Sequence, residues 1–450
     1  MAADKDPVTG GVMPARGVSR RTRLDSYVDR YATRTHGMTA SEIRALFAVA
    51  SRPEVVSLAG GMPSIDGLPL ASVADSVSRL LATRGASALQ YGSGQGDPVL
   101  REQICTVMAL EGIQAHPEDV VVTVGSQQGL DLVTRIFCDP GDTVVCEAPS
   151  YVGALGVFRA YESAVVHVEM DDAGLVPEAL RHALASAAAR RAPVKFVYSV
   201  PTYHNPAGVT LTAQRRTEVL DICAEFDVLL VEDNPYGLLG FTGEPMRAIR
   251  ADESERVVYL GSFSKTFAPG LRVGWVLAPH AVREKLVLAQ ESATLCPPTM
   301  SQAVVSTYLA EHDWRGQIKA FRELYRERRD TMLAALTEHL PAPVRWTRPD
   351  GGFYVWVQLP EGLDAQAMLP RAVTARVAYV PGTAFYADGL GSRHLRLSYC
   401  YPTPERIRAG VRRLAGVIAA EVELRETFGA SLPPGAGAQH TYERPGPDQS

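Results

Sequence analysis

The chain has 450 residues, a formal net charge of −5 at pH 7, and a composition that is 46% hydrophobic and 21% charged. This composition excludes a disordered chain, a fibre and a disulfide-dense secreted scaffold, and the length is sufficient to bury a large core. No apolar run approaches the ~18 residues of a membrane-spanning helix. The mild acidity argues against nucleic-acid binding, which normally requires a basic surplus. We therefore expect neither a membrane nor a nucleic acid as partner.

The cysteines are scattered along the chain, and no pair of them has the spacing of a metal site. Several lie in apolar runs, which is typical of buried, reduced thiols in a reducing cytoplasm. Arginines near the N-terminus are not followed by an apolar segment, so a signal peptide is not expected. The sequence thus predicts a cytoplasmic protein without a metal site.

Short β-branched runs alternate with helical patterns through much of the chain. Strands are predicted at Val120–Val124, Thr143–Glu147, Val165–Glu169, Val194–Val200, Val228–Glu232, Val257–Gly261 and Val273–Ala278. Helices are predicted at Gln128–Phe137, Val176–Arg190 and Ala213–Phe226. Continuous apolar strands separated by helices are typical of a mainly parallel sheet flanked by helices on both faces, which is an α/β fold.

The pattern changes after a long amphipathic segment, Arg315–Leu340, whose apolar residues recur at helical spacing. Beyond it, strands are predicted at Gly352–Leu359 and His394–Tyr399, and helices at Ala365–Thr374 and Pro404–Leu424. These elements predict a smaller α+β unit. Gly, Pro and Arg interrupt the first 25 residues, and prolines interrupt the chain after Phe428, so both ends are predicted to be mobile tails.

Polar sequences follow several predicted strands, and in an open α/β sheet ligands bind at the carboxyl ends of strands. Gly125-Ser126-Gln127-Gln128 passes directly into a helix, whose N-terminus can bind phosphate, although by itself Ser126 is more simply a helix N-cap. The segment around Asn205 could be an ordinary turn. Glu232-Asp233 could be a solvated strand end, but two buried carboxylates need partners, and a cationic ring nitrogen would suit one of them.

Lysine is rare in this chain, and one lysine stands apart from the others. Lys265 follows a strand in the segment Gly261–Lys265, and Arg272 lies in the next turn. The remaining lysines lie in a tail, on charged helix faces or at the start of a strand: Lys5, Lys285, Lys319 and Lys195. Elimination therefore leaves Lys265 as the candidate reactive amine.

Together the strand ends provide an amine, a carboxylate and a set of phosphate ligands. The phosphate ligands would be Ser126, Gln127, Ser262, Ser264 and Arg272. Pyridoxal phosphate requires this combination, because a lysine must form its Schiff base, an acid must keep its ring nitrogen protonated, and its phosphate must be held. These residues predict pyridoxal phosphate as the cofactor.

With these and other segments, the sequence resembles the fold-type I pyridoxal-phosphate-dependent aminotransferases of classes I and II. It is most similar to the branch of 2-aminoadipate and kynurenine aminotransferases and the aminotransferase-like domains of MocR regulators. The resemblance covers about Gly37 to Leu424 and rests on Ser57–Pro63, Leu89–Tyr91, Gly125–Gln128, Ala148–Tyr151, Asn205–Gly208, Asp233–Tyr236, Ser262–Lys265 and Leu395–Tyr399. Ala207 stands where threonine is common in the family.

The resemblance implies catalytic roles for Lys265, Asp233 and Tyr151. Lys265 would form the Schiff base and move the substrate proton, Asp233 would pair with the pyridinium nitrogen, and Tyr151 would stack on the ring. The phenolic oxygen of the cofactor would be held by Asn205 and Tyr236. The chain would form a homodimer, in which Tyr91 reaches the phosphate across the interface.

For the substrate, the resemblance implies binding by Arg396, Asn205 and Gly61. A guanidinium suits a bidentate grip on an α-carboxylate, although without the resemblance an arginine in an edge strand would be interpreted as a surface residue. The N-terminal segment would cover the active site, and its Arg44 would either receive a distal carboxylate, as of glutamate or 2-aminoadipate, or be a solvated helix residue. His204 would either line the pocket or be structural.

The implied organisation is a large α/β domain and a smaller α+β domain built from both chain ends. Its parts are a mobile tail at 1–25, an N-terminal segment at 26–76 that joins the small domain and covers the active site, a large cofactor-binding domain at 77–325, a small domain at 326–425 and a disordered tail at 426–450.

The expected activity is transfer of an amino group from an L-amino acid to a 2-oxo acid. Another pyridoxal-phosphate reaction, by a lyase, decarboxylase or oxidase, stays open because such enzymes share the cofactor-binding residues. An effector-binding regulator module is a remote alternative, since only about 50 residues precede Gly60, too few for a winged-helix domain and a linker.

Overall fold

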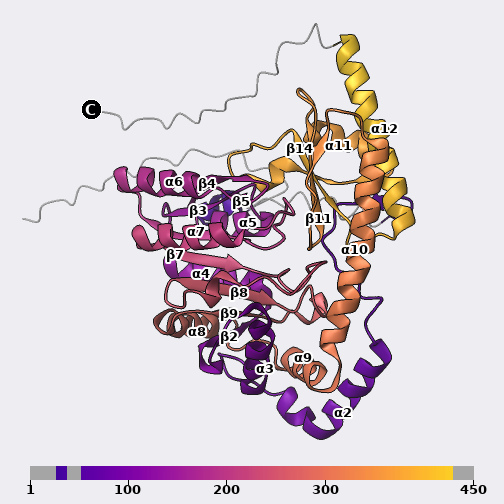
Figure 1. Ribbon diagram of the computed structural model, residues 1–450. Coiled ribbons are helices and arrows are strands. Elements are labelled where there is room, and N and C mark those ends of the chain that lie inside the picture. Colours follow the sequence, from indigo (N-terminus) through magenta and orange to yellow (C-terminus); the bar gives the residue numbers. More distant parts are fainter. Residues whose placement is uncertain (1–26, 38–51, 429–450) are drawn as a thin grey trace, which may run out of the picture.

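The computed structural model describes residues 27–37 and 52–428 and is dominated by a sheet of eight strands (Figure 1). The order across the sheet is β2 (Val120–Thr123), β9 (Gly274–Leu277), β8 (Val257–Ser262), β7 (Leu229–Asp233), β6 (Val194–Ser199), β3 (Thr143–Ala148), β4 (Ala164–Asp171) and β5 (Gly174–Leu175). The pairings from β8 through to β4 are parallel, and β9 is antiparallel to both of its neighbours. Strand β2 therefore runs in the same direction as β8, and the carboxyl ends of β2, β8, β7, β6, β3 and β4 share one edge.

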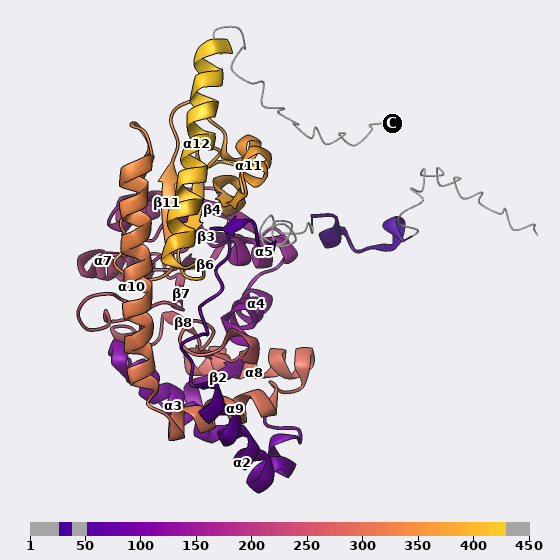
Figure 2. The same ribbon diagram turned by 90° about the vertical axis from the view of Figure 1, so that its right-hand side faces the viewer.

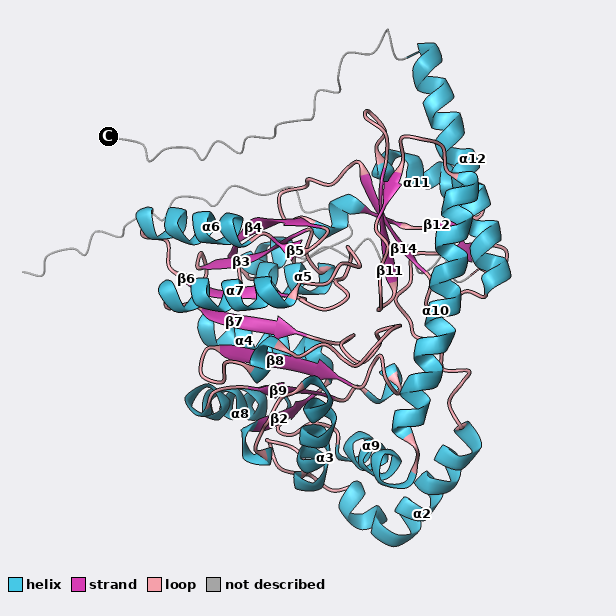
Figure 3. Cartoon of the chain, viewed as in Figure 1, coloured by secondary structure: helices cyan, strands magenta, loops and turns pink. Residues whose placement is uncertain are grey.

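Helices cover both faces of this sheet because side chains alternate along each strand. On β3, Val144 and Cys146 belong to the core on one face, whereas Val145 belongs to the core on the other. The first face is covered by α4 (Gly125–Phe137), α5 (Val152–Ala160) and α8 (His280–Thr294). The second face is covered by α6 (Pro177–Ala189) and α7 (Ala213–Glu225), as Figure 3 shows. The predicted α/β fold with a mainly parallel sheet is confirmed.

A group of helices extends the large domain beyond β2. These are α2 (Leu70–Ala88), α3 (Pro98–Met108) and α9 (Thr299–Glu311), and α9 packs against the other two. Helix α10 (Trp314–His339) runs from this end of the molecule past the sheet, and packs beside α12 (Pro404–Phe428) in the small domain (Figures 1 and 2). The predicted domain boundary between residues 325 and 326 thus falls inside one continuous helix.

The small domain contains an antiparallel sheet in the order β10 (Arg345–Trp346), β11 (Tyr354–Gln358), β14 (His394–Ser398) and β13 (Val380–Pro381). A short parallel pair joins β1 (Val56–Ser57) of the N-terminal segment to β12 (Val377–Ala378), and α11 (Ala365–Thr374) lies nearby. Strand β14, which carries Arg396, lies inside the sheet, so its expected position at an edge is wrong. Short 3-10 helices occupy Val28–Arg30, Thr33–Gly37, Ala109–Glu111, Pro117–Asp119, Ile249–Ala251, Pro269–Leu271 and Gly382–Phe385.

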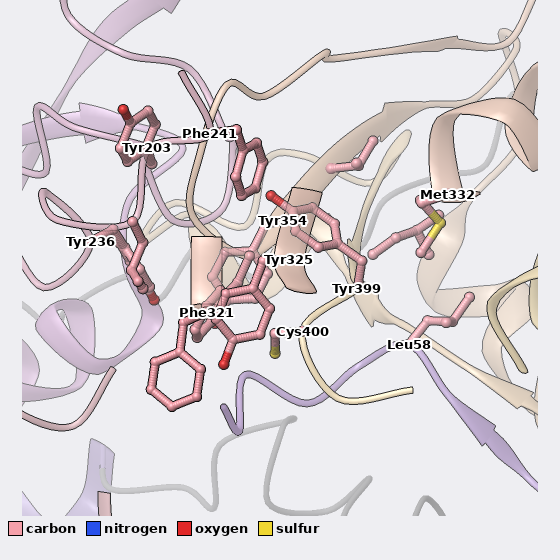
Figure 4. Packing of buried hydrophobic residues seen from close by; sticks show 14 of the residues in the cluster. Leu58, Tyr203, Tyr236, Phe241, Phe321, Tyr325, Met332, Tyr354, Tyr399 and Cys400 are labelled. Carbon is pink, nitrogen blue, oxygen red and sulfur yellow. The ribbon is translucent and has the colours of Figure 1, made fainter. Parts of the chain in front are cut away.

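One apolar core is continuous between the two domains (Figure 4). The ring of Phe353, which precedes β11, lies 5.3 Å from Tyr236 of the large domain and 4.8 Å from Tyr325 on α10, measured between ring centroids. This packing holds the small sheet against the strand ends of the large sheet. Among the described residues, no helix has the length and apolar character that crossing a membrane requires.

Candidate active site

A cavity of about 400 Å³ lies where the carboxyl ends of the large-sheet strands face the small domain. Its lining includes all but two of the predicted site residues: Gly61, Ser126, Gln127, Tyr151, Asn205, Asp233, Tyr236, Ser262, Ser264, Lys265, Arg272 and Arg396. Tyr91 does not line it, and 77% of that residue is exposed. Arg44 lies outside the described residues. We call this space the active-site cavity.

The two consecutive carboxylates at the end of β7 point to opposite faces. Glu232 accepts the backbone N–H groups of Ile249 at 3.1 Å and Arg250 at 2.8 Å, and it does not line the cavity. Asp233 lines the cavity; its Oδ2 accepts the hydroxyl of Tyr198 at 2.7 Å, and its buried Oδ1 has no partner among the described residues. Burial raises the pKa of Asp233 to about 6, so the carboxylate is largely ionised at neutral pH. Because both acids are buried, the interpretation as a solvated strand end is wrong.

Lys265 presents its amine in the loop after β8. Its Nζ donates to the carbonyl of Gly61 at 2.8 Å and lies 5.6 Å from the ring centroid of Phe353. Burial lowers the pKa of Lys265 from 10.5 to about 8, and the guanidinium groups of Arg396 and Arg272 act in the same direction. A substantial fraction of this amine is therefore neutral near pH 8, which is the form that attacks a carbonyl group.

An anion site lies at the N-terminus of α4, where backbone N–H groups and the helix dipole favour negative charge. Arg272 donates to Ser264 Oγ at 3.2 Å and to the Val124 carbonyl at 3.2 Å, which holds its guanidinium beside this helix end. Gly274 allows the close approach of β9, because a Cβ there would lie 2.5 Å from the backbone nitrogen of Ser126. Together with Ser262, these groups form a pocket of hydroxyls and one cation that suits a phosphate.

Tyr151 covers the cavity from the start of α5. Its hydroxyl donates to Gln127 Oε1 at 3.3 Å, and Gln127 Nε2 donates to the carbonyl of Gly153 at 3.0 Å. Burial raises the pKa of Tyr151 to about 12, so the phenol stays neutral. The ring is thereby fixed at the wall of the cavity, in a position where it can stack on a planar ligand.

Arg396 is a buried cation without an acidic partner among the described residues. Only 2% of it is exposed, and its guanidinium donates to Asn205 Oδ1 at 2.8 Å and to the Ala59 carbonyl at 2.7 Å. The guanidinium carbon lies 4.2 Å from the ring centroid of Tyr354 and 5.0 Å from that of Phe385. A buried, oriented guanidinium of this kind has capacity for a carboxylate ligand.

Comparison with known proteins agrees with this chemistry. The family model "Aminotransferase class I and II" matches residues 53–414. The chain belongs to this aminotransferase family. An aromatic-amino-acid aminotransferase of Thermococcus litoralis is 42% identical over 88% of the chain and 96% of its own length. A 2-aminoadipate transaminase of Thermus thermophilus is 38% identical over 83% of the chain and 93% of its own length.

Solved structures show the same relationship. A kynurenine aminotransferase of Pyrococcus horikoshii, in complex with pyridoxamine phosphate, superposes with a TM-score of 0.85 at 39% identity, covering 89% of this aminotransferase and all of the other chain. The predicted membership of the fold-type I aminotransferases is confirmed, and so is pyridoxal phosphate as the cofactor.

The cavity of this aminotransferase fits that cofactor in three independent respects. Oδ1 of Asp233, which has no partner among the described residues, can accept a hydrogen bond from a protonated ring nitrogen. The amine of Lys265 lines the same cavity and has a lowered pKa. The hydroxyl and guanidinium groups at the start of α4 offer a site for the phosphate.

Sequence reasoning missed several residues that hold these groups in place. Tyr198, which bonds Asp233, and Tyr354, which stacks on Arg396, occupy strand positions that are indistinguishable from core in the sequence. His204 does not line the cavity; it is buried, with Nε2 3.1 Å from Glu147 Oε2 and Nδ1 accepting the N–H of Ala207 at 3.2 Å. The structure therefore favours the structural interpretation of His204, as a brace for the loop that carries Asn205.

Proposed function

We propose that this aminotransferase moves an amino group between an L-amino acid and a 2-oxo acid, with Lys265 as the amine that binds the cofactor and shuttles the substrate proton. The observation that carries this proposal is the convergence on one cavity of a lysine of lowered pKa, an unpartnered aspartate oxygen and a buried arginine. Within the residues that the structure describes, neither the Asp233 oxygen nor Arg396 has the oppositely charged partner that the cofactor or an amino acid would supply.

Several side chains that would bind the cofactor are held in place by hydrogen bonds within the protein, among them Asp233, Tyr151 and Arg272. Asp233 would receive the ring nitrogen, Tyr151 would stack on the ring, and Asn205 and Tyr236 would face its phenolic oxygen. The phosphate would lie among Ser126, Gln127, Ser262, Ser264 and Arg272. When bound, pyridoxal phosphate supplies an electron sink for the electrons released at the substrate α-carbon. Lys265 Nζ would accept the proton that leaves the substrate α-carbon. Its lowered pKa leaves part of the amine neutral, and so able to accept a proton, near neutral pH.

The substrate α-carboxylate would bind Arg396, with Asn205 and Gly61 beside it. The guanidinium, which is planar, is fixed in position by the Tyr354 ring and by its hydrogen bonds to Asn205 and Ala59. Replacing Arg396 by Lys removes the bidentate fork, so we expect the KM for amino donors to rise by about 10- to 100-fold. Steady-state kinetics with one donor would measure this, and an unchanged KM would contradict the assignment.

The side-chain specificity of the donor is the open part of the function. The relatives are named for aromatic amino acids, 2-aminoadipate and kynurenine, and these three classes define the first screen. Arg44 would bind a distal carboxylate if dicarboxylates are substrates. Arg44→Ala would then lose turnover of 2-aminoadipate and keep that of aromatic donors, whereas unchanged turnover of both would assign Arg44 to the solvated surface.

A homodimer in the cytoplasm is the proposed state of the protein. The exposure of Tyr91 and Leu89, at 77% and 71%, supports a second chain that covers this loop. The cysteines support a reducing compartment, because Cys105, Cys138, Cys146, Cys223, Cys296 and Cys400 are all free thiols.

The deciding experiment is a donor and acceptor screen that identifies both products. Transamination predicts that an oxo acid and a new amino acid form in equal amounts, and that the donor alone changes the visible absorbance of the bound cofactor. Lys265→Ala should abolish turnover, whereas the exposed-lysine control Lys285→Ala should retain it. Release of carbon dioxide or consumption of oxygen without a new amino acid would contradict the proposal.

A further inference from the structure

A second cavity lies between the two domains, beside the active-site cavity but with no lining residue in common; we call it the outer cavity. Its volume is about 610 Å³, within the range of small-molecule sites. One face of the small sheet lines both cavities, because Tyr354 and Arg396 face the active site while Trp356 and His394, further along the same strands, face the outer cavity.

The floor of the outer cavity is aromatic. The ring of Trp356 stacks on that of His394, with centroids 5.3 Å apart and planes inclined by 6°. Tyr386 completes this surface, whereas Trp346 on the neighbouring strand β10 pairs with Val357 and packs on the opposite face of the small sheet. Burial lowers the pKa of His394, so its imidazole is neutral at pH 7. Such a surface favours a planar ring that can stack or pack edge-on.

One ring nitrogen of this aromatic surface, Nδ1 of His394, is buried without a partner among the described residues. A neutral imidazole nitrogen can donate or accept a hydrogen bond. Because buried polar groups in native proteins are almost always satisfied, an unsatisfied ring nitrogen beside a cavity points to a ligand with a polar group.

The charges around the cavity favour an anionic ligand. Arg345 and Arg348 line it, are exposed, and form no ion pair with any described residue. On the opposite side, the carboxylate of Asp171 is occupied by Arg215, whose nitrogens lie 2.6 and 2.7 Å from its two oxygens. Asp172 is then the one acidic lining residue without an ion pair to any described residue, so two arginines and one aspartate around the cavity lack such a pair within this part of the chain.

We propose that the outer cavity is a second, non-catalytic site for an aromatic carboxylate. The ring of the ligand packs against Trp356 and His394, and its carboxylate is held by Arg348. The cavity walls also include Pro149 and Ala207, which belong to the loops that carry Tyr151 and Asn205 on their other side. The occupant therefore contacts the back of two active-site loops without entering the active site.

The test uses the holoenzyme with its active site blocked by aminooxyacetate, and 3-phenylpropanoate as the probe. This probe has the ring and the carboxylate but no amino group, so it cannot be transaminated. Titration calorimetry should show one saturable site per chain. Tryptophan fluorescence should change on saturation, because two of the four tryptophans line the cavity.

Variants separate this site from non-specific binding. Arg348→Ala should weaken binding by about tenfold. Arg412→Ala, which removes an exposed arginine on α12 that does not line the cavity, is the matched control and should bind like the wild type. Absence of saturable binding to the blocked holoenzyme, or equal affinities in Arg348→Ala and the wild type, would overturn the proposal.

Discussion

At the scale of single residues, the neighbours Glu232 and Asp233 show how strand alternation separates a structural carboxylate from one with a free oxygen. Both are buried, yet Glu232 accepts hydrogen bonds from two backbone N–H groups, whereas one oxygen of Asp233 has no partner within the described part of the chain. Burying a carboxylate oxygen without a partner is costly unless a ligand completes it. A substitution at Asp233 therefore tests the role of the carboxylate in the cavity, and the same change at Glu232 is its control.

Asp233→Asn should reduce kcat/KM by about two to four orders of magnitude, because breaking one buried charge pair costs about 3–5 kcal/mol. Tyr198 can still donate to the amide oxygen, so the fold should be retained. Glu232→Gln should instead lower the free energy of unfolding by about 1–3 kcal/mol and spare kcat/KM. Steady-state kinetics and thermal unfolding measure both effects. An equal loss of activity in the two variants would remove the special role of Asp233.

The lowered pKa of Lys265 predicts how the cofactor-free protein captures pyridoxal phosphate. Only the neutral amine attacks the carbonyl, and the neutral fraction rises as pH passes through a pKa of about 8 instead of 10.5. The rate of capture, followed by visible absorbance from pH 6 to 10, should therefore rise with a midpoint near 8. A midpoint above 10 would show that the amine is not perturbed. Lys265→Ala should bind the cofactor without forming a Schiff base.

At the scale of elements, a buried hydrogen-bond network ties the turn after β7 to the segment after α3. Glu111 accepts the side-chain amide of Asn234 at 2.7 Å and the hydroxyl of Tyr259 at 2.8 Å. Asn234 directly follows Asp233, so Glu111 helps to set the turn that leads from Asp233 to Tyr236. No cation bonds to Glu111 among the described residues, and burial raises its pKa to about 7.

This raised pKa predicts a pH-dependent contribution to stability. The folded state holds the Glu111 proton more tightly than the unfolded state, so the contribution is complete below pH 4.5 and is lost as pH rises through 7. Glu111→Gln should remove this dependence, and its side-chain amide can donate to the buried Oδ1 of Asn234 that now lacks a partner. Between pH 5 and 8, the free energy of unfolding of the wild type should fall by up to about 3 kcal/mol relative to Glu111→Gln. Chemical denaturation at the two pH values measures this, with the exposed Glu102→Gln as control. Parallel pH profiles for wild type and Glu111→Gln would refute it.

The same elements show how far sequence alone leads. Strands buried on both faces, such as β3 and β8, could be predicted because their apolar runs are continuous. Helices α2, α3, α5, α8 and α9 were not predicted, although α3 buries Leu100, Ile104 and Val107 at helical spacing, so its local pattern does indicate a helix. The grouping of polar strand ends around one cavity followed from the parallel topology. The role of Asn234 could not be found, because its partner Glu111 is 123 residues away and no local pattern links them.

At the scale of the whole molecule, the contact between domains determines both cavities. The face of the small sheet that carries Tyr354 and Arg396 closes the active-site cavity, and the same face continues into the outer cavity. A ligand in either cavity contacts both domains. The loop between α2 and α3 has no such closing surface within the described chain, and its Tyr91 and Leu89 are among the most exposed large apolar residues.

Tyr91 therefore provides a test of whether a second chain completes the active site. Tyr91→Ala and Lys265→Ala should each be strongly impaired as homodimers. If the two variants are unfolded and refolded together, about half of the dimers should be hybrids. One of the two sites in each hybrid combines an intact Lys265 with the intact Tyr91 of the partner subunit. About a quarter of all sites are then complete, so the mixture should regain about a quarter of the wild-type activity. The control is a mixture of Lys265→Ala with Asp233→Asn, which should restore nothing because both residues act within one chain. If the Tyr91 mixture also stays inactive, no intact Tyr91 reaches a neighbouring site, and the exposed loop has another function.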